Sequence, residues 1–431
     1  MPWPMWLDSG VLRERAADYD ILVADPVYRV ICHGELTRVV DRDGRSRESR
    51  EPLLDILRSL LEQKADDGSL PFTGGAVGYF SYDYGRRLQG LNSTESGTSM
   101  PEAALGIYDW ALVLDHRRQQ AWLSGRSSDS RSVSYWESLD QSLKTMVNPV
   151  AGEALPGFAG QPVSNMDRPA YAEAFRRIQH YLVEGDCYQV NLAQRFTLGF
   201  NGDPWQLYLR MRQQNPAPYG AYLDLPFGKI LSSSPEQFVG LAGGSAITRP
   251  IKGTRPRGST QAEDEKLANE LLSSEKDRAE NLMIVDLLRN DLGRVCEPGS
   301  IQVPELFRVE TYATVHHLVS TITGRLRTDE DALSLLQASF PGGSITGAPK
   351  HRAMQIIQEL EADSREVYCG SIGWIGFNGN MNTNIAIRTL LIRNRQASYW
   401  AGGGIVADSQ VAEEFGETLH KAAAFFRLAR S

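Results

Sequence analysis

Cysteine is scarce in this sequence of 431 residues, and the four cysteines, Cys32, Cys187, Cys296 and Cys369, lie far apart. No two of them form a C-x-x-C pair, so their spacing indicates neither a zinc site nor a disulfide framework. Because unpaired cysteines suit a reducing compartment, we expect a cytoplasmic protein.

Long apolar runs and blocks of one charge are also missing. No stretch approaches the roughly 18 apolar residues of a membrane span, and the first residues, MPWPMWLDSG, lack the basic lead and apolar core of a signal peptide. The 45 Lys and Arg residues are spread along a chain whose formal charge is -8, whereas nucleic-acid-binding proteins gather them in blocks. We therefore expect no membrane anchor and no nucleic-acid partner.

The chain is rich enough in hydrophobic residues to form a large core. They make up 42% of 431 residues, a length that exceeds an average single domain. Between residues 124 and 167 the composition changes to Ser, Gly, Pro and polar residues, around a short helical stretch near 135–146. This pattern predicts an N-terminal region over 1–150 and a C-terminal region over 166–431.

Apolar runs and alternation predict several strands. Residues 21–23 and 111–114 are apolar runs that end at turn residues. From 187 to 196 apolar and polar residues alternate, which puts Gln189 and Asn191 on the face opposite the apolar one.

Helical spacing of apolar residues predicts three helices of interest. The first begins after Asp167, a plausible N-cap, and ends near Gly185. The second covers ENLMIVDLLRNDLG from Glu280 onward and looks buried nearly all round. The third begins near Asp408, with an apolar stripe and a separate charged face that an ordinary helix would expose to water. The stripe contains Phe415, Leu419, Ala422 and Phe426, and the charged face contains Glu414, Glu417 and Lys421.

The segment TRPIKGTRPRG over 248–258 places Arg249, Lys252, Arg255 and Arg257 near one turn. Such a turn suits a multiply anionic small molecule, although an exposed basic turn has the same local sequence. Lys252 lies between Ile251, whose apolar side chain can lower an amine pKa, and Gly253, which leaves room for a covalent adduct.

Two glutamates are candidates for chemistry. Glu236 follows Pro235 at the edge of an apolar run, where burial could keep it protonated as a general acid, or where it could simply open a strand in solvent. Glu280 shares a helical face with Ile284, so its charge needs a cation. That cation is either Lys276 or Arg278, or a divalent metal ion bound by Glu280 and Glu417.

Two glycine-rich segments favour anion binding. FPGGSITGAPK over 340–350 leads into a helix, where free backbone N–H groups attract an anion. Its last residues are Ala348-Pro349-Lys350 and not Lys-Ser/Thr, which argues against a nucleotide-binding P-loop. AGGGI over 401–405 is a second turn that can close over a carboxylate.

Together these segments resemble the chorismate-utilising enzymes, a family that includes anthranilate, isochorismate, salicylate and aminodeoxychorismate synthases. The resemblance runs from about Asp167 to the C-terminus and is weaker over the N-terminal third. It rests on long motifs in the same order: GDCYQVNLAQRF, SSSPEQF, PIKGTRPRG, EKDRAENLMIVDLLRNDLG, VHHLVSTITG, FPGGSITGAPK, GSIGWIGFNGNMNTNIAIRT and AGGGIVADS. It implies an α+β fold of the anthranilate-synthase type, a complex sandwich with orthogonally packed antiparallel sheets and outer helices.

The resemblance also implies roles for individual residues. The implied catalytic residues are Lys252, Glu236, His317 and Gln189. The implied chorismate-binding residues are Ser344, Trp374, Arg388, Gly402, Gly404 and Lys421. The implied magnesium ligands are Glu280 and Glu417 with Glu414 nearby, and the implied tryptophan-binding residues are Ser9, Pro218, Tyr219 and Gly220.

Within the family, Lys252 distinguishes between reactions. Anthranilate synthases usually read P-I-A-G-T here, whereas aminodeoxychorismate synthases read P-I-K-G-T, as this chain does. The resemblance thus implies amination of chorismate to 4-amino-4-deoxychorismate through a covalent lysine intermediate, in para-aminobenzoate and folate synthesis. Gln189 stands where isochorismate-type enzymes have a general-base lysine, which argues against attack by water. The alternatives are an anthranilate synthase and a non-catalytic chorismate-binding subunit.

The chain contains no G-x-S-x-G motif or Cys/His glutaminase arrangement. We therefore expect ammonia to come from a separate glutamine amidotransferase subunit, component II of such enzymes. The resemblance implies Mg²⁺ as the cofactor, and it leaves open whether tryptophan is bound.

Overall fold

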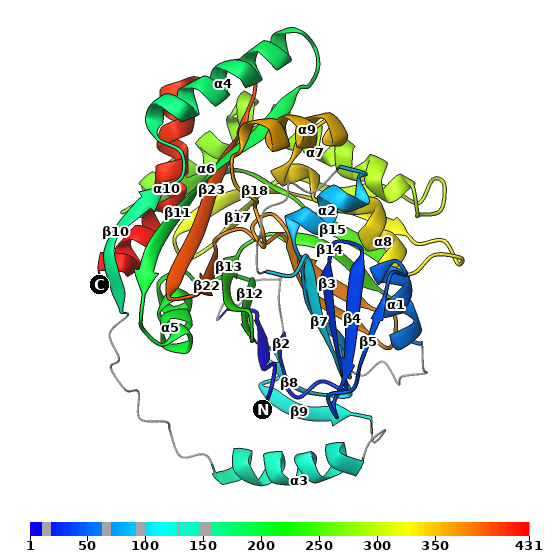
Figure 1. Cartoon of the computed structure of the whole chain (residues 1–431). Helices are drawn as coiled ribbons and strands as arrows, with labels where there is room; N and C mark the ends of the chain where they lie inside the picture. Colours follow the sequence, from blue (N-terminus) through cyan, green and yellow to red (C-terminus); the bar gives the residue numbers. More distant parts are fainter. Residues whose placement is uncertain (11–18, 63–69, 92–99, 127–129, 146–156, 431) are drawn as a thin grey trace.

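The computed structural model describes residues 1–10, 19–62, 70–91, 100–126, 130–145 and 157–430. Within these residues, antiparallel pairing joins the strands into two sheets, and the longer helices lie on the outside of the molecule (Figure 1). The predicted α+β fold with two large antiparallel sheets is confirmed.

The first sheet combines strands from the beginning, the middle and the end of the chain. In the described part its order is β10-β11-β23-β22-β13-β12-β1-β2-β8-β9, and the short β19 pairs with β11. The strands are β1 (Met5–Asp8), β2 (Tyr19–Val23), β8 (Trp110–Asp115), β9 (Gln120–Gly125), β10 (Phe158–Ser164), β11 (Gln189–Phe200), β12 (Tyr219–Leu225), β13 (Gly228–Ser234), β19 (Gly347–Ala348), β22 (Thr389–Arg393) and β23 (Gln396–Ile405).

The second sheet has the same mixed origin. Its order is β16-β18-β15-β14-β21-β20-β6-β7-β3-β4-β5, and β17 pairs with β18. The strands are β3 (Tyr28–His33), β4 (Leu36–Asp41), β5 (Ser46–Ser49), β6 (Gly75–Phe80), β7 (Ala103–Tyr108), β14 (Gln237–Ala242), β15 (Ser245–Arg249), β16 (Ile251–Pro256), β17 (Gln302–Thr311), β18 (Val315–Arg325), β20 (Ser371–Gly376) and β21 (Met381–Asn384).

Helices connect and cover the sheets (Figure 1). They are α1 (Leu53–Leu60), α2 (Tyr82–Leu88), α3 (Ser130–Thr145), α4 (Arg168–Val183), α5 (Pro204–Gln214), α6 (Gln261–Ser273), α7 (Glu275–Gly293), α8 (Ala332–Ser339), the 3-10 turn η1 (Gly343–Ile345), α9 (Lys350–Leu360) and α10 (Val411–Arg430).

Strands from the two predicted regions lie side by side in both sheets. β1 pairs with β12 on one side and β2 on the other, and β6 pairs with β20 over Gly75–Phe80 and Ser371–Gly376. A Cβ on Gly75 would lie 2.2 Å from the Ile375 carbonyl oxygen, so this close pairing requires glycine. The division into 1–150 and 166–431 does not separate the sheets, and as a statement about domains it stays a prediction. Residues 146–156 of the predicted crossing lie outside the described residues.

Several predicted elements are confirmed. The runs at 21–23 and 111–114 belong to β2 and β8, and the alternating segment belongs to β11. α4 begins after Asp167, whose side chain accepts a hydrogen bond from the Ala170 N–H at 2.9 Å, as an N-cap does.

The structure corrects two predicted helix faces. α7 begins at Glu275 after the N-cap Ser274, and it is buried on one side only, because Leu282 is 45% exposed. On α10 the buried stripe contains Glu414, Thr418, Ala422, Phe425 and Leu428. Leu419 is 36% exposed instead. The predicted stripe was shifted because it assumed that Glu414 faces solvent, whereas the fold buries this carboxylate.

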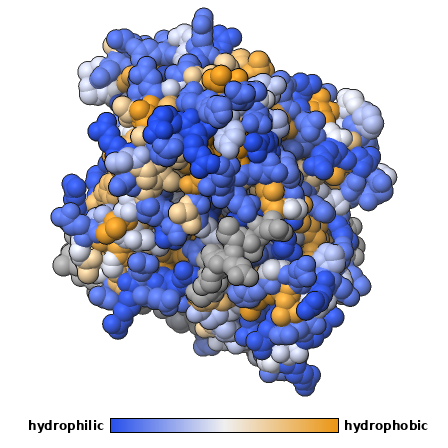
Figure 2. Space-filling model, turned by 45° about the horizontal axis from the view of Figure 1, so that its top comes forward, coloured by the Kyte–Doolittle hydropathy of each residue, from blue (hydrophilic) through white to orange (hydrophobic). Residues whose placement is uncertain are grey.

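The face of the molecule shown in Figure 2 is mostly hydrophilic. In the face shown in Figure 2, hydrophobic residues form small, separated patches. None of the described helices has the length and apolar character needed to cross a membrane.

Candidate active site

Lys252 lies on β16, and its side chain points to the turn η1. The Lys252 ammonium donates a hydrogen bond to the Ser344 carbonyl oxygen at 3.0 Å. Burial lowers the pKa of Lys252, while the charges of Glu280 and Glu236 act in the opposite direction. The amine therefore loses its proton more easily than an exposed lysine would.

Glu236 lies between β13 and β14 and is 5% exposed. The Ile251 N–H approaches its Oε1 atom at 3.4 Å. Burial raises the pKa of Glu236, and the Ser344 hydroxyl and the Lys252 charge offset part of this effect. Glu236 and Lys252 are thus shifted toward their neutral forms, as a proton donor and an amine nucleophile require.

His317 is buried on β18 opposite Thr254 of β16. The Thr254 Oγ1 and His317 Nδ1 atoms share a hydrogen bond of 2.8 Å. Burial lowers the pKa of His317 to about 3, and the nearby charge of Arg388 acts in the same direction. The imidazole is therefore neutral near neutral pH. Arg388, whose φ of 51° is in the left-handed region, also lies within electrostatic reach of Glu236.

Gln189 lies at the start of β11, beside Gly404. The prediction of a turn over 401–405 was wrong, because these residues form the end of strand β23 and pair with β11. A Cβ on Gly404 would lie 1.8 Å from the Gln189 Nε2 atom, so the Gln189 side chain packs directly on this glycine. The Gln189 side chain is buried, and its Oε1 atom has no hydrogen-bond partner among the described residues. A lysine at this position would therefore bring a charge into a closely packed place.

α10 brings three predicted residues to the same end of β23. The Lys421 ammonium lies 2.6 Å from the Glu417 carboxylate, with both side chains about half exposed, and donates to the Gly402 carbonyl oxygen at 2.9 Å. Glu414 is buried, and its Oε1 atom accepts a hydrogen bond from the Ser409 hydroxyl at 2.7 Å. Burial raises the pKa of Glu414.

Glu280 on α7 lies within electrostatic reach of Glu417 on α10. Burial raises the pKa of Glu280, Lys252 and Lys276 lower it, and the Glu417 charge raises it further. Of the two predicted ion-pair partners, Lys276 acts through its charge, whereas Arg278 lies over the Phe307 ring at 5.1 Å. Glu417 behaves differently, because Lys421, Lys252 and Lys276 together outweigh burial and lower its pKa.

The described protein side chains alone do not make a complete metal site, so a bound substrate would have to supply further oxygen ligands. Among the described residues, no group of three or more His, Cys, Asp and Glu side chains is close enough together to bind a metal. Glu280 and Glu417 are, however, electrostatically coupled to each other and to Lys252. Two carboxylates fit a hard cation that takes its remaining oxygens from a bound carboxylate and water.

Comparison with known proteins agrees with this arrangement. Residues 9–427 match the family of chorismate binding enzymes. The chain belongs to this family. It is 48% identical to aminodeoxychorismate synthase component 1 of Escherichia coli over 98% of this chain and 92% of the relative. The corresponding protein of Klebsiella aerogenes is 46% identical, over 97% of this chain and 92% of the relative.

A solved structure supports the same relationship. Anthranilate synthase component I from Streptococcus pneumoniae superimposes with a TM-score of 0.85 and 32% identity, covering 97% of this chain and 94% of the other. The predicted family is confirmed, and with it the prediction of an enzyme.

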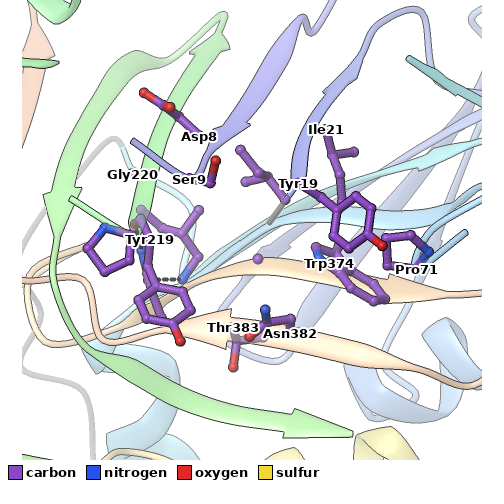
Figure 3. A pocket seen from close by; sticks show the side chains of 15 residues that line it. Asp8, Ser9, Tyr19, Ile21, Pro71, Tyr219, Gly220, Trp374, Asn382 and Thr383 are labelled. Carbon is purple, nitrogen blue, oxygen red and sulfur yellow. Dashed lines mark hydrogen bonds between the residues drawn. The ribbon is translucent and has the colours of Figure 1, made fainter. Parts of the chain in front are cut away.

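This chorismate-binding enzyme has a cavity between its two sheets. A cavity of about 210 Å³ is lined by residues of β1, β2, β12, β20 and β21 and the loops next to them (Figure 3). All four predicted tryptophan-binding residues, Ser9, Pro218, Tyr219 and Gly220, line it. Ser9 donates through its N–H and hydroxyl to Asp20 at 2.8 and 2.7 Å.

Trp374 lies in this cavity. It lines the cavity beside Tyr19 and Pro71 and packs on Phe72 with ring centroids 5.4 Å apart. Its predicted role in binding chorismate with Arg388 and Lys421 stays a prediction. Ile372 and Trp374 of β20 share the face that lines the cavity, because side chains alternate along a strand.

Sequence reasoning missed residues that surround the site. Thr254, within the PIKGT motif, contacts His317 directly. Arg365 and Glu361 form a buried ion pair beside η1. Their local sequence, LEADSRE, is polar and typical of an exposed turn, so it contains no sign of this burial.

Proposed function

We propose that this chorismate-binding enzyme converts chorismate and ammonia into 4-amino-4-deoxychorismate, the precursor of para-aminobenzoate in folate synthesis. The observation that supports this most is the partly buried Lys252 amine, which donates to the Ser344 carbonyl oxygen and whose lowered pKa suits a nucleophile. The names of the relatives at 48% and 46% identity agree with it.

The proposed reaction has two steps, attack by Lys252 and displacement of Lys252 by ammonia. In the first, the Lys252 nitrogen bonds to ring carbon two, the ring double bonds shift, and the bond from carbon four to its hydroxyl breaks. Glu236 donates the proton with which that hydroxyl leaves as water, and the attacking amine loses a proton. In the second, ammonia bonds to carbon four, the double bonds shift back, and the lysine leaves with the proton that the new amine gives up.

The remaining residues bind and orient the substrate. Arg388 and Lys421 supply positive charge for the two carboxylates of chorismate, and the backbone N–H groups at Gly402 and Gly404 add hydrogen-bond donors. His317 stays neutral near the ring, so it donates or accepts a hydrogen bond without adding charge. Gln189 replaces a general base, which leaves water at the ring unactivated.

Magnesium is the proposed cofactor. Glu280 and Glu417 would bind it, with Glu414 next to them, and the ring carboxylate of chorismate would complete the ligands. The bound ion would draw electron density toward that carboxylate.

Ammonia is proposed to come from a separate subunit. The relatives are called component 1, and this chain has no glutaminase motif of its own. A glutamine amidotransferase would therefore be the partner, and free ammonium salt should replace it in an assay.

The cavity in Figure 3 is proposed to bind tryptophan. It offers an aromatic wall at Trp374 and polar groups at Ser9, Asn382 and Thr383, which suit an amphipathic amino acid. Calorimetry with L-tryptophan tests this proposal, with Trp374→Ala as the variant that should lose binding because it removes the aromatic wall of the cavity.

One assay separates the candidate functions. The protein is incubated with chorismate, Mg²⁺ and ammonium salt, and a lyase is added that releases the aromatic product. para-Aminobenzoate supports the proposal. Fluorescent anthranilate would instead assign the chain to the activity named for the relative at 32% identity, and binding without turnover would indicate a non-catalytic subunit.

A further inference from the structure

Arg365 joins three separate segments beside the candidate active site. Its guanidinium forms a two-pronged pair with the Glu361 carboxylate, at 2.8 Å from Nε and 2.7 Å from Nη2. Nη1 donates to the Ile345 carbonyl oxygen at 3.0 Å. Nη2 also donates to the Asn191 carbonyl oxygen at 2.9 Å. The side chain is 1% exposed.

The surroundings hold this guanidinium in one orientation. It lies over the Tyr82 ring at 4.7 Å and near the Tyr368 ring at 5.8 Å. Glu361 is fixed in turn, because its Oε1 atom also accepts a hydrogen bond from the Ala193 N–H of β11 at 2.8 Å. Arg365 therefore connects α9, β11 and η1 through groups that cannot easily move.

The segment that Arg365 holds contains Ser344. The Ile345 carbonyl that accepts from Arg365 is one residue from the Ser344 carbonyl that accepts from Lys252. The Ser344 hydroxyl contacts Glu236. A shift of η1 would thus move a hydrogen-bond partner of both proposed catalytic residues at once.

Burial of an arginine here is not explained by stability alone. A buried ion pair gains little over well-packed apolar side chains, because both charges must leave water. A planar fork with five donors does, however, fix the direction of several acceptors at the same time. Geometry is therefore the property that this arginine supplies.

We infer that Arg365 is a positioning residue, which acts through Ile345 and Ser344 to hold Lys252 and Glu236 in reacting geometry. This inference rests on the proposed lysine mechanism. Loss of the Arg365 guanidinium should lower the rate of the chemical step and leave chorismate binding nearly unchanged. The reason is that its hydrogen bonds within the described part of the chain go to Glu361, Ile345 and Asn191, and not to the proposed substrate-binding residues.

The test compares Arg365→Lys with a matched control, Arg42→Lys. Arg42 is also buried, at 6% side-chain exposure, and pairs with Asp25 and Asp109 far from η1 in sequence. Each variant and the wild type are measured for thermal unfolding, for kcat and KM, for the pH dependence of kcat, and for the adduct on Lys252 formed with chorismate and no ammonia. If Arg365→Lys does not fold, Arg365→Met with Glu361→Met removes both charges together and takes its place.

We expect kcat and the rate of adduct formation to fall roughly 100-fold in Arg365→Lys. The KM for chorismate should stay within about threefold, and the pH profile should shift, because Ser344 no longer sets the environment of Lys252 and Glu236. Arg42→Lys should lose stability only. Equal kcat and pH profiles in the two Arg→Lys variants would overturn the inference. Absence of the adduct in the wild type would instead overturn the proposed function.

Discussion

At the scale of single residues, burial is the main determinant of the proposed chemistry. It disfavours whichever form is charged, so it lowers the pKa of Lys252 and raises that of Glu236. When both groups are charged, each partly offsets the desolvation energy of the other, so burial shifts the two pKa values less than it would alone. A lysine amine and a carboxylic acid can then serve as nucleophile and acid in one site.

The pH dependence of the rate follows from these two roles. Lys252 must be neutral, so the rate rises with pH, whereas Glu236 must be protonated, so the rate falls again at high pH. The Glu236→Gln variant keeps the size and shape of the side chain, but its amide cannot donate an acidic proton. We expect turnover to fall by a factor on the order of 10² to 10⁴, and the decline at high pH to disappear.

Rate measurements across pH, with Glu48→Gln on the exposed strand β5 as the control, test this assignment. A Glu236→Gln variant that retains the decline at high pH would show that another group is the acid.

Sequence patterns identified most of these residues but not their surroundings. Lys252 and Glu236 lie in motifs that a family resemblance can match, and the structure brings both to Ser344. Arg365 has no such mark, because its neighbours in the sequence are polar and its burial arises from β11 and η1, which are distant in the chain. The cavity that Trp374 lines could not be predicted either, since a one-dimensional motif does not say which face of a strand meets which cavity.

At the scale of elements, two helices supply the acidic residues. α7 presents Glu280, and α10 presents Glu414 and Glu417. Helical periodicity located both helices, yet it misjudged their faces, because the preference of Leu419 for burial and of Glu414 for solvent is overridden by how α10 packs on β23. Propensity is a local property, whereas burial is decided by the partner element.

The magnesium proposal predicts a shared effect of the two helices. Glu280→Gln and Glu417→Gln each remove a charged oxygen ligand and little packing, so the fold should persist while Mg²⁺ affinity in the presence of chorismate falls at least about tenfold. Titration calorimetry measures the affinity, and circular dichroism checks the fold.

Glu413→Gln is the matched control, since Glu413 is an exposed residue of the same helix. Unchanged Mg²⁺ affinity in both Glu280→Gln and Glu417→Gln would mean that these carboxylates only balance the charges of Lys252, Lys276 and Lys421.

At the scale of the whole molecule, the sheets are shared between distant parts of the chain. The N-terminal strands β1 and β6 each pair with strands that occur more than two hundred residues later, β12 and β20. The largest core cluster likewise combines residues from both ends, such as Val30 and Ile405. A sequence can predict individual strands from alternation, but pairing between such distant segments leaves no local pattern.

This organisation predicts one cooperative unfolding transition. Denaturant unfolding should give the same midpoint by circular dichroism and by tryptophan fluorescence. A chain of residues 157–431 alone should not fold, because β12 and β20 would lose β1 and β6 and expose their edges. A stable, cooperatively folded fragment of that length would instead support two separate domains.

The central claim is that Lys252 acts as a nucleophile, and mass spectrometry of the protein with chorismate and without ammonia tests it most directly. An adduct should form on the peptide that contains Lys252 and should disappear when ammonium is added and product forms. Lys252→Arg keeps the charge, but it should form no adduct and lose most of the turnover. Full turnover in Lys252→Arg, or a wild-type protein that turns over chorismate with no adduct on Lys252, would contradict the account.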